Sequence, residues 1–195
     1  MTESKIYCSR RAFLAAATAA GAALGVAESI GAAVQPVAEV GRPAGQKSVF
    51  GLRVPPMSRV RIGFIGMGGR GLSLLNNLLD IDGVEIKAVC DTVPERVKSA
   101  QRRVAAKGQA EPAGYSKGET DFEHLCQRTD LDLVYIATPW DWHVRMAVSA
   151  MKNGKHAAVE VPAAITIEEC WQLVDTAEQT QRHCMMLENC CYPWT

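Results

Sequence analysis

The chain has 195 residues, and its 21 lysine and arginine residues balance 21 aspartate and glutamate residues, so the formal net charge is zero. This balance argues against a strongly basic surface of the kind that binds nucleic acids or anionic membranes. The hydrophobic fraction of 48% and the charged fraction of 22% are those of a globular protein rather than of a disordered chain. The length is enough for one domain, or a little more.

Residues 1–30 are predicted to be a targeting segment that is not part of the fold. The pair Arg10-Arg11 precedes an alanine-rich apolar run that ends in small residues near position 27, a pattern typical of a bacterial twin-arginine signal peptide. The run is shorter and less apolar than the about 20 residues that a transmembrane helix needs. We therefore expect export by the twin-arginine machinery to the periplasm or the medium, with no membrane span in the mature chain. An amphipathic N-terminal helix is the alternative.

Residues 31–57 are predicted to be a linker, because glycine and proline residues interrupt any regular period there. The compact domain is then expected over residues 58–195. Six cysteines follow the targeting segment, none of them in a CxxC pair: Cys90, Cys126, Cys170, Cys184, Cys190 and Cys191. Because the twin-arginine route exports proteins that have folded in the reducing cytoplasm, we predict buried free thiols rather than disulfides or a metal site.

From residue 59 onward, strand-like and helix-like segments alternate. Strands are expected over residues 60–65, 84–90, 131–138, 156–161 and 183–187, and helices over about 72–79, 94–107, 121–126, 141–153 and 167–180, the last with Thr166 as its N-cap. Residues 108–118 are expected to form a loop. The alternation predicts an α/β fold of the Rossmann type, in which helices cover both faces of a doubly wound parallel sheet.

A glycine-rich loop, Gly66-x-Gly68-x-x-Gly71, follows the first predicted strand and opens the next helix. In dinucleotide-binding proteins these glycines allow a tight turn, close approach to the pyrophosphate, and packing of the helix on the strand. The helix N-terminus offers free N–H groups to phosphates, and Arg70 adds a positive charge. Asp91 ends the second strand, where its carboxylate can accept from both ribose hydroxyls and would repel a 2′-phosphate. We predict that this loop binds NAD rather than NADP; an ordinary glycine turn is the alternative.

Aromatic and ionisable side chains follow the later strands. The segments concerned are Pro139-Trp140-Asp141-Trp142-His143, Glu160-Val161-Pro162 and Glu188-Asn189. Since the carboxyl ends of parallel strands meet at one edge of the sheet, we expect these segments to lie near the same crevice. A flat indole there could wall the nicotinamide pocket; packing of the tryptophans against a neighbouring domain is the alternative.

This order of motifs resembles the superfamily of glucose–fructose oxidoreductase and inositol dehydrogenase. Its ordinary dehydrogenases have asparagine after a Thr-Pro pair, which is Thr138-Pro139 in this chain, and the next residue here is Trp140. They also have a catalytic lysine between a glutamate and a proline, and this position is Val161, between Glu160 and Pro162. A valine cannot transfer a proton. The variant pattern, with Trp142 and with the sequence Leu-Glu-Asn-Cys-Cys-Tyr over residues 187–192, is similar to glycoside hydrolase family 109, and the resemblance covers about residues 60–192.

The resemblance to family 109 implies an NAD-dependent α-N-acetylgalactosaminidase that acts on glycoconjugates or oligosaccharides. In this mechanism bound NAD oxidises the C3 hydroxyl of the sugar, the C1 substituent is eliminated, water adds, and C3 is reduced again. Together with Gly68 of the loop motif, the expected cofactor contacts are Gly69, Arg70, Asp91, Trp140, Asp141, Trp142, His143, Glu160, Val161 and Asn189. No catalytic residue is assigned, because the family's second α+β domain, which carries the sugar-binding groups, would follow residue 195.

The chain therefore resembles the cofactor-binding part of a longer enzyme. We expect weak stability and no turnover from the 195 residues alone. Two alternatives stay open: a divergent NAD-dependent sugar dehydrogenase of the same superfamily, which would release NADH with free sugar, and a non-catalytic NAD-binding remnant.

Overall fold

The computed structural model describes residues 46–188. The predicted targeting segment, the first part of the predicted linker, and Asn189, Cys190 and Cys191 lie outside the described residues. Within residues 46–188, no helix is long and apolar enough to cross a membrane.

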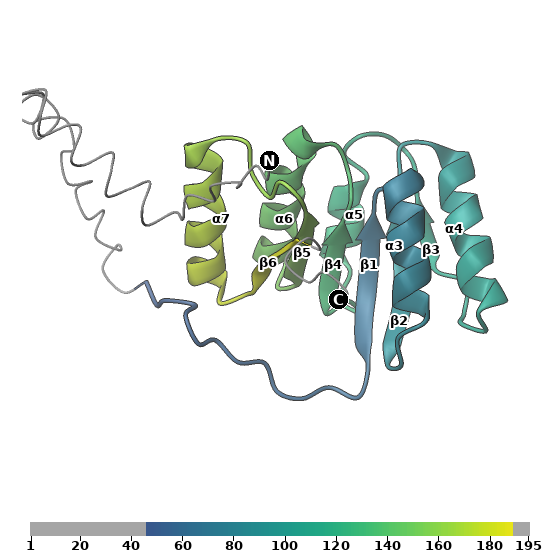
Figure 1. The fold of residues 1–195 in the computed structure, drawn as a ribbon, viewed down its shortest axis with the longest axis horizontal. Helices are drawn as coiled ribbons and strands as arrows, with labels where there is room; N and C mark the ends of the chain where they lie inside the picture. Colours follow the sequence, from purple (N-terminus) through teal and green to yellow (C-terminus); the bar gives the residue numbers. More distant parts are fainter. Residues whose placement is uncertain (1–45, 189–195) are drawn as a thin grey trace, which may run out of the picture. The chain divides into compact units, whose positions relative to one another are not determined.

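The described residues form a single parallel sheet covered by helices (Figure 1). The strands are β1 (Val60–Ile65), β2 (Val84–Cys90), β3 (Ala113–Tyr115), β4 (Leu133–Ile136), β5 (His156–Glu160) and β6 (Cys184–Leu187). The helices are α3 (Gly69–Leu79), α4 (Pro94–Ala106), α5 (Phe122–Gln127), α6 (His143–Lys152) and α7 (Ile167–Thr180), with a 3₁₀ turn, η1 (Trp140–Trp142), before α6.

The strand order is β3-β2-β1-β4-β5-β6, and every neighbouring pair is parallel. The chain runs outward from β1 to β3 and then returns to the other side of β1, so the order reverses between β1 and β4. This is the Rossmann arrangement, and the predicted fold class is confirmed.

Two local predictions are wrong. Residues 113–115 form β3 at one edge of the sheet instead of continuing a loop, and residues 140–142 form η1, so that α6 begins at His143 and not near residue 141. β3 has only three residues, too few for an alternating pattern to be recognised in the sequence.

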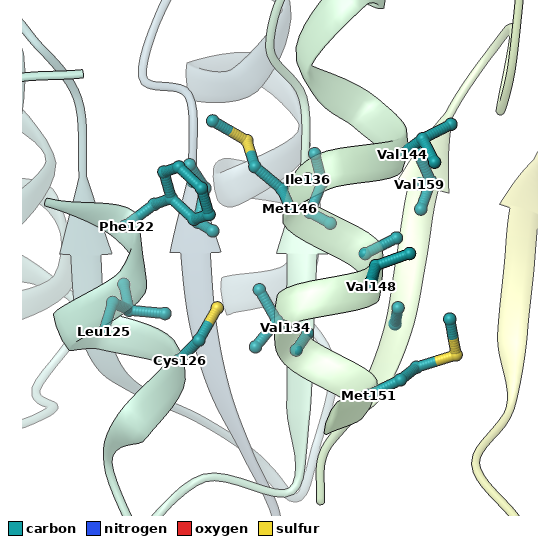
Figure 2. Close-up of a cluster of buried hydrophobic side chains, with 14 of the residues drawn as sticks. Phe122, Leu125, Cys126, Val134, Ile136, Val144, Met146, Val148, Met151 and Val159 are labelled. Carbon is teal, nitrogen blue, oxygen red and sulfur yellow. The ribbon is translucent and has the colours of Figure 1, made fainter. Parts of the chain in front are cut away.

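The strands supply a separate apolar core to each face of the sheet, because successive side chains point to opposite sides. Ile62 and Phe64 of β1 pack with α3 and α4, whereas Val134 and Ile136 of β4 pack with α5, α6 and α7. Figure 2 shows this second cluster, in which Phe122 of α5 and the apolar side of α6 lie against the strands. Burial on both faces explains why these strands read as nearly continuous apolar runs in the sequence.

The described part of the predicted linker, residues 46–57, contains no helix or strand, yet it begins in contact with α7. The amide of Gln46 donates to Asp175 at 3.4 Å and to Glu178 at 3.1 Å. Val49 packs against the core cluster that contains α7. At least its first residues therefore contribute contacts to the domain.

The four cysteines of the described residues are free thiols. Cys90 and Cys126 are buried, as predicted, and burial raises the pKa of Cys90 to about 12 and that of Cys126 to about 11. Cys184 is partly buried and Cys170 is exposed, so the prediction of buried thiols does not hold for Cys170.

Candidate cofactor-binding site

A hollow of about 470 Å³ opens at the carboxyl edge of the sheet, above the glycine loop. Its lining residues come from the ends of β1, β2 and β4, from α3, α4, η1 and α6, and from the start of α5 with the segment before it. It lies where the strand order reverses between β1 and β4, and open α/β sheets bind their ligands at such a point. Of the residues predicted to bind the cofactor, the hollow brings together Gly68, Gly69, Arg70, Asp91 and Trp142.

The glycines of the loop differ in what surrounds them. Gly66 has a φ of +94°, and a Cβ atom there would overlap the carbonyl of Ala137 after β4. A Cβ atom at Gly71 would overlap the carbonyl oxygen of Gly66. Gly68 and Gly69 have nothing within 4 Å of an added Cβ atom, so the fold itself leaves room for side chains there. Their surroundings are open where a dinucleotide would lie, which fits close approach of a ligand to the backbone.

The N-terminus of α3 faces the hollow, and Arg70 in its first turn is already paired. The guanidinium of Arg70 lies 3.1 Å from a carboxylate oxygen of Glu160 at the end of β5, and Glu160 is only 8% exposed. Burial, together with the negative charge of Glu160, raises the pKa of Tyr135 to about 12. Because of the ion pair, the positive charge of Arg70, which is predicted to face the phosphates, is shared with the buried carboxylate of Glu160.

Asp91 is bound by the backbone around it. One carboxylate oxygen accepts from the N–H of Met67 in the glycine loop at 2.7 Å, and the other accepts from the N–H of Val93 at 2.9 Å. The guanidinium of Arg96 lies 3.6 Å from that second oxygen. Asp91 thus ties the glycine loop to the end of β2, a structural role beyond its predicted contact with the ribose.

Trp142 forms one wall of the hollow, and two neighbours fix its ring. Phe122 meets the indole edge-on with ring centroids 6.2 Å apart, and the guanidinium of Arg145 lies 4.5 Å from the indole centroid. Trp140 and Asp141 do not line this hollow; they are exposed beside a second, shallower one of about 400 Å³. Residues 140–142, which follow β4, therefore line two different hollows.

His143 is fully buried and connects two turns at the edge of the sheet. Its Nδ1 atom lies 2.8 Å from the carbonyl oxygen of Pro162, and its Nε2 atom lies 2.9 Å from that of Thr138. The imidazole therefore joins the turn after β4 to the turn after β5, where Val161 is half-buried. Direct contact of His143, Glu160 or Val161 with the cofactor stays a prediction.

Several residues of the hollow were not predicted from the sequence. They are Thr92, Arg96, Gly118, Glu119, Phe122 and Met146. The sequence could have indicated Arg96, because this residue lies in the first turn of the helix that begins at Pro94, shortly after Asp91. The other residues lie in segments that show neither a helical nor a strand-like pattern, or on a helix whose orientation toward the hollow cannot be predicted from the sequence.

The residues present fit a dinucleotide. A turn with glycine at positions 66, 68 and 69 leads into the N-terminus of an eleven-residue helix, whose first N–H groups have no intrahelical acceptor. A half-exposed arginine and a buried carboxylate flank that turn. Within residues 46–188, no three histidine, cysteine, aspartate or glutamate side chains gather in a way that could hold a metal ion.

The sequence matches a family model described as an oxidoreductase family with an NAD-binding Rossmann fold, over residues 60–188. It is 52% identical to a glycosyl hydrolase family 109 protein of Saccharopolyspora erythraea over 186 residues, which are 94% of this chain and 40% of that protein. A family 109 protein of Bacteroides fragilis is 50% identical over 151 residues, 77% of this chain and 32% of its own length. The resemblance to family 109 is confirmed, and the chain spans at most 40% of the length of these relatives.

Solved structures agree with the fold. An NAD-binding protein from Listeria innocua, 28% identical, superposes with a TM-score of 0.58 over 69% of this chain and 36% of its own. The WlbA dehydrogenase from Chromobacterium violaceum, solved with NADH and UDP-GlcNAcA, is 24% identical and superposes with a TM-score of 0.60 over 70% of this chain and 37% of its own. Both superpositions support the Rossmann fold, and NAD as the cofactor follows from the family model.

Proposed function

We propose that this chain, which belongs to the oxidoreductase family with an NAD-binding Rossmann fold, is the cofactor-binding part of a glycosidase that removes terminal α-linked N-acetylgalactosamine. Its substrates would be glycoconjugates or oligosaccharides. The observation that carries the proposal is the end of β5, where Glu160 is ion-paired with Arg70 and is followed by Val161. Ordinary sugar dehydrogenases of the resembling superfamily have a catalytic lysine at the position of Val161, and valine cannot exchange a proton.

The residues of this chain would bind and orient the cofactor. The N–H groups at the start of α3 and the charge of Arg70 would hold the pyrophosphate above Gly68 and Gly69. Asp91 would accept from the adenosine ribose while it keeps the glycine loop in place. Trp142, braced by Phe122 and Arg145, would exclude water from one side of the hollow.

When bound, NAD supplies transient oxidation of the sugar at C3, which acidifies the C2 hydrogen so that the C1 substituent can be eliminated before water adds and C3 is reduced. The groups of this chain at the hollow are suited to holding a cofactor, and we assign none of them the removal of that proton. The proton acceptor and the sugar-binding groups are proposed to belong to the longer protein.

The experiment is to read the coding DNA downstream of Thr195 in all three frames and to express the longest related product beside the 195-residue chain. Each is incubated with NAD and an aryl α-N-acetylgalactosaminide. The longer product is expected to release the phenol with no net gain of NADH, and the shorter chain to release none. Absence of release by a longer, NAD-binding product would contradict the glycosidase proposal.

The second candidate is an NAD-dependent sugar dehydrogenase, which the family match favours as well. It predicts a steady gain of NADH absorbance with free N-acetylgalactosamine and no release from the aryl glycoside. Val161 counts against it, because the superfamily's proton-transferring lysine is missing there. A clean stop with no related sequence downstream would favour an NAD-binding remnant instead.

We also propose that the protein is exported through the twin-arginine route. The support is the Arg10-Arg11 pair before an alanine-rich run. A cofactor that is regenerated in every turnover suits export of a folded, loaded enzyme. Replacing both arginines by lysine is expected to leave the protein in the cytoplasm, and unchanged export would contradict the proposal.

A further inference from the structure

Arg96 lies beside Asp91 on the wall of the hollow. Its guanidinium is 3.6 Å from Asp91, and its side chain is half-exposed, so it can turn toward a ligand without breaking a buried contact. We propose that Arg96 is a specificity-determining residue, which reads the 2′ position of the adenosine ribose together with Asp91. This inference rests on the cofactor site proposed above.

The first step concerns the hydrogen-bonding capacity of Asp91. An ionised carboxylate offers about four lone pairs. The N–H groups of Met67 and Val93 use one on each oxygen, at 2.7 Å and 2.9 Å, and Arg96 faces the oxygen that Val93 occupies. Because 3.6 Å is too long for a hydrogen bond, one acceptor position on each oxygen is left for the two ribose hydroxyls. A ribose hydroxyl that binds the oxygen facing Arg96 would lie beside its guanidinium, which places Arg96 next to the ribose.

The second step concerns charge. In dinucleotide-binding folds an acid at the end of the second strand selects NAD, and a nearby arginine accommodates the 2′-phosphate of NADP. This hollow holds both groups, and they are paired with each other. The guanidinium of Arg96 can bind a phosphate with two parallel N–H donors once it leaves the carboxylate. Asp91 therefore disfavours NADP in two ways: it repels the 2′-phosphate, and it holds the arginine that would bind it.

The test compares the dissociation constants of NAD and NADP, measured by titration calorimetry, for the wild-type chain and for Asp91→Asn. Neutralising Asp91 frees Arg96, so the ratio of the two constants is expected to shift toward NADP by about tenfold or more, the size of one hydrogen bond to a charged group. The shift is expected to be clearly smaller in Asp91→Asn/Arg96→Gln, where only the repulsion of the 2′-phosphate by Asp91 has been removed. It is expected to persist in Asp91→Asn/Arg102→Gln, because Arg102 is an exposed residue of the same helix and does not line the hollow.

The ratio remains informative if the Asp91→Asn substitution weakens the glycine loop, because a loosened contact with Met67 lowers the affinity for both cofactors. Arg96→Gln alone leaves the backbone bonds of Asp91 in place, and it is expected to weaken NADP more than NAD. A shift of the same size with and without Arg96, or no shift in Asp91→Asn, would overturn the inference alone. A wild-type chain that binds neither cofactor would overturn the proposed cofactor site as well.

Discussion

The glycines of the loop serve two different purposes, and the space around each one separates them. Gly66 and Gly71 are required by the fold, because a Cβ atom at either position would overlap a backbone carbonyl. Gly68 and Gly69 meet no such obstacle. The packing of the protein therefore does not require glycine at these two positions, which agrees with the proposed approach of the cofactor to the backbone there.

Gly71→Ala and Gly69→Ala are therefore expected to differ in their effect on stability. Overlap with the carbonyl of Gly66 should lower the free energy of unfolding of Gly71→Ala by about 1–3 kcal/mol. Gly69→Ala, at the first position of α3, should leave it unchanged or raise it by up to about 1 kcal/mol. Urea denaturation of both variants checks this, and equal losses would contradict the distinction.

For single residues, the sequence predicted positions at the hollow better than it predicted the hydrogen bonds that these residues form. The spacing of the glycines and Asp91 was sufficient to place these residues together at the hollow. The bonds from Asp91 to the N–H groups of Met67 and Val93 could not be predicted, since they depend on the path of the backbone. The same holds for His143, whose ring connects two carbonyls that are distant in the sequence.

Among the secondary-structure elements, α7 begins with a complete capping box. The Thr166 hydroxyl accepts from the N–H of Glu169 at 3.1 Å, and a carboxylate oxygen of Glu169 accepts from the N–H of Thr166 at 3.3 Å. These bonds satisfy backbone donors that the helix itself leaves without acceptors. They confirm Thr166 as the N-cap and the start of the helix that was expected there.

Thr166→Ala is expected to lower the free energy of unfolding by about 1 kcal/mol. Thr129→Ala is the matched control, since Thr129 is exposed outside any helix or strand, and it should change the value by no more than about 0.5 kcal/mol. Thermal or urea denaturation measures both. A loss in the control as large as that in Thr166→Ala would show that the cap is not the cause.

The junction of β5 and β6 contains an imidazole that must remain neutral. Nδ1 of His156 accepts from the backbone N–H of His183 at 3.0 Å, and the two rings lie 5.2 Å apart. Burial lowers the pKa of His156, and the positive charges of His183 and Arg182 lower it further, while Asp132 opposes them. A proton on Nδ1 would remove the acceptor of this bond.

Stability should therefore fall in mild acid. Because the folded state holds the proton of His156 less tightly than the unfolded chain, the free energy of unfolding is expected to decrease as the pH falls through about 6.5, the ordinary histidine value, and to level off below the folded-state pKa. His156→Gln should show a shallower decrease in urea denaturation at a series of pH values. An identical slope in wild type and variant would exclude His156 as the group responsible.

The elements that the sequence predicted well are those with long apolar runs or clear ends. α4 begins at Pro94, as its sequence indicated, and β1, β2, β5 and β6 lie within a residue or so of the expected ranges. β3 was missed because its place depends on pairing with β2, and not on a local pattern. η1 was read as the first turn of α6, since 3₁₀ and α turns share similar residues.

For the whole molecule, the strand order places the hollow and the remaining apolar surface at different positions. The hollow lies above the reversal between β1 and β4. Exposed apolar side chains occur instead on α7, at Ile167, Trp171 and Val174, and on the edge strand β6, at Met185 and Met186. None of these five residues lines the hollow.

The measurement that tests the central claim most directly is calorimetric titration of NAD into the wild-type chain and into Gly68→Val. Gly68 has extended backbone angles, φ −70° and ψ −171°, that valine adopts, and open space around it. The variant is therefore expected to keep the melting temperature of the wild type while its side chain blocks the approach of the pyrophosphate. We predict binding at one site in the wild type and at least about a hundredfold weaker binding in the variant. Equal affinities in two equally stable proteins would contradict the assignment of the cofactor to the glycine loop.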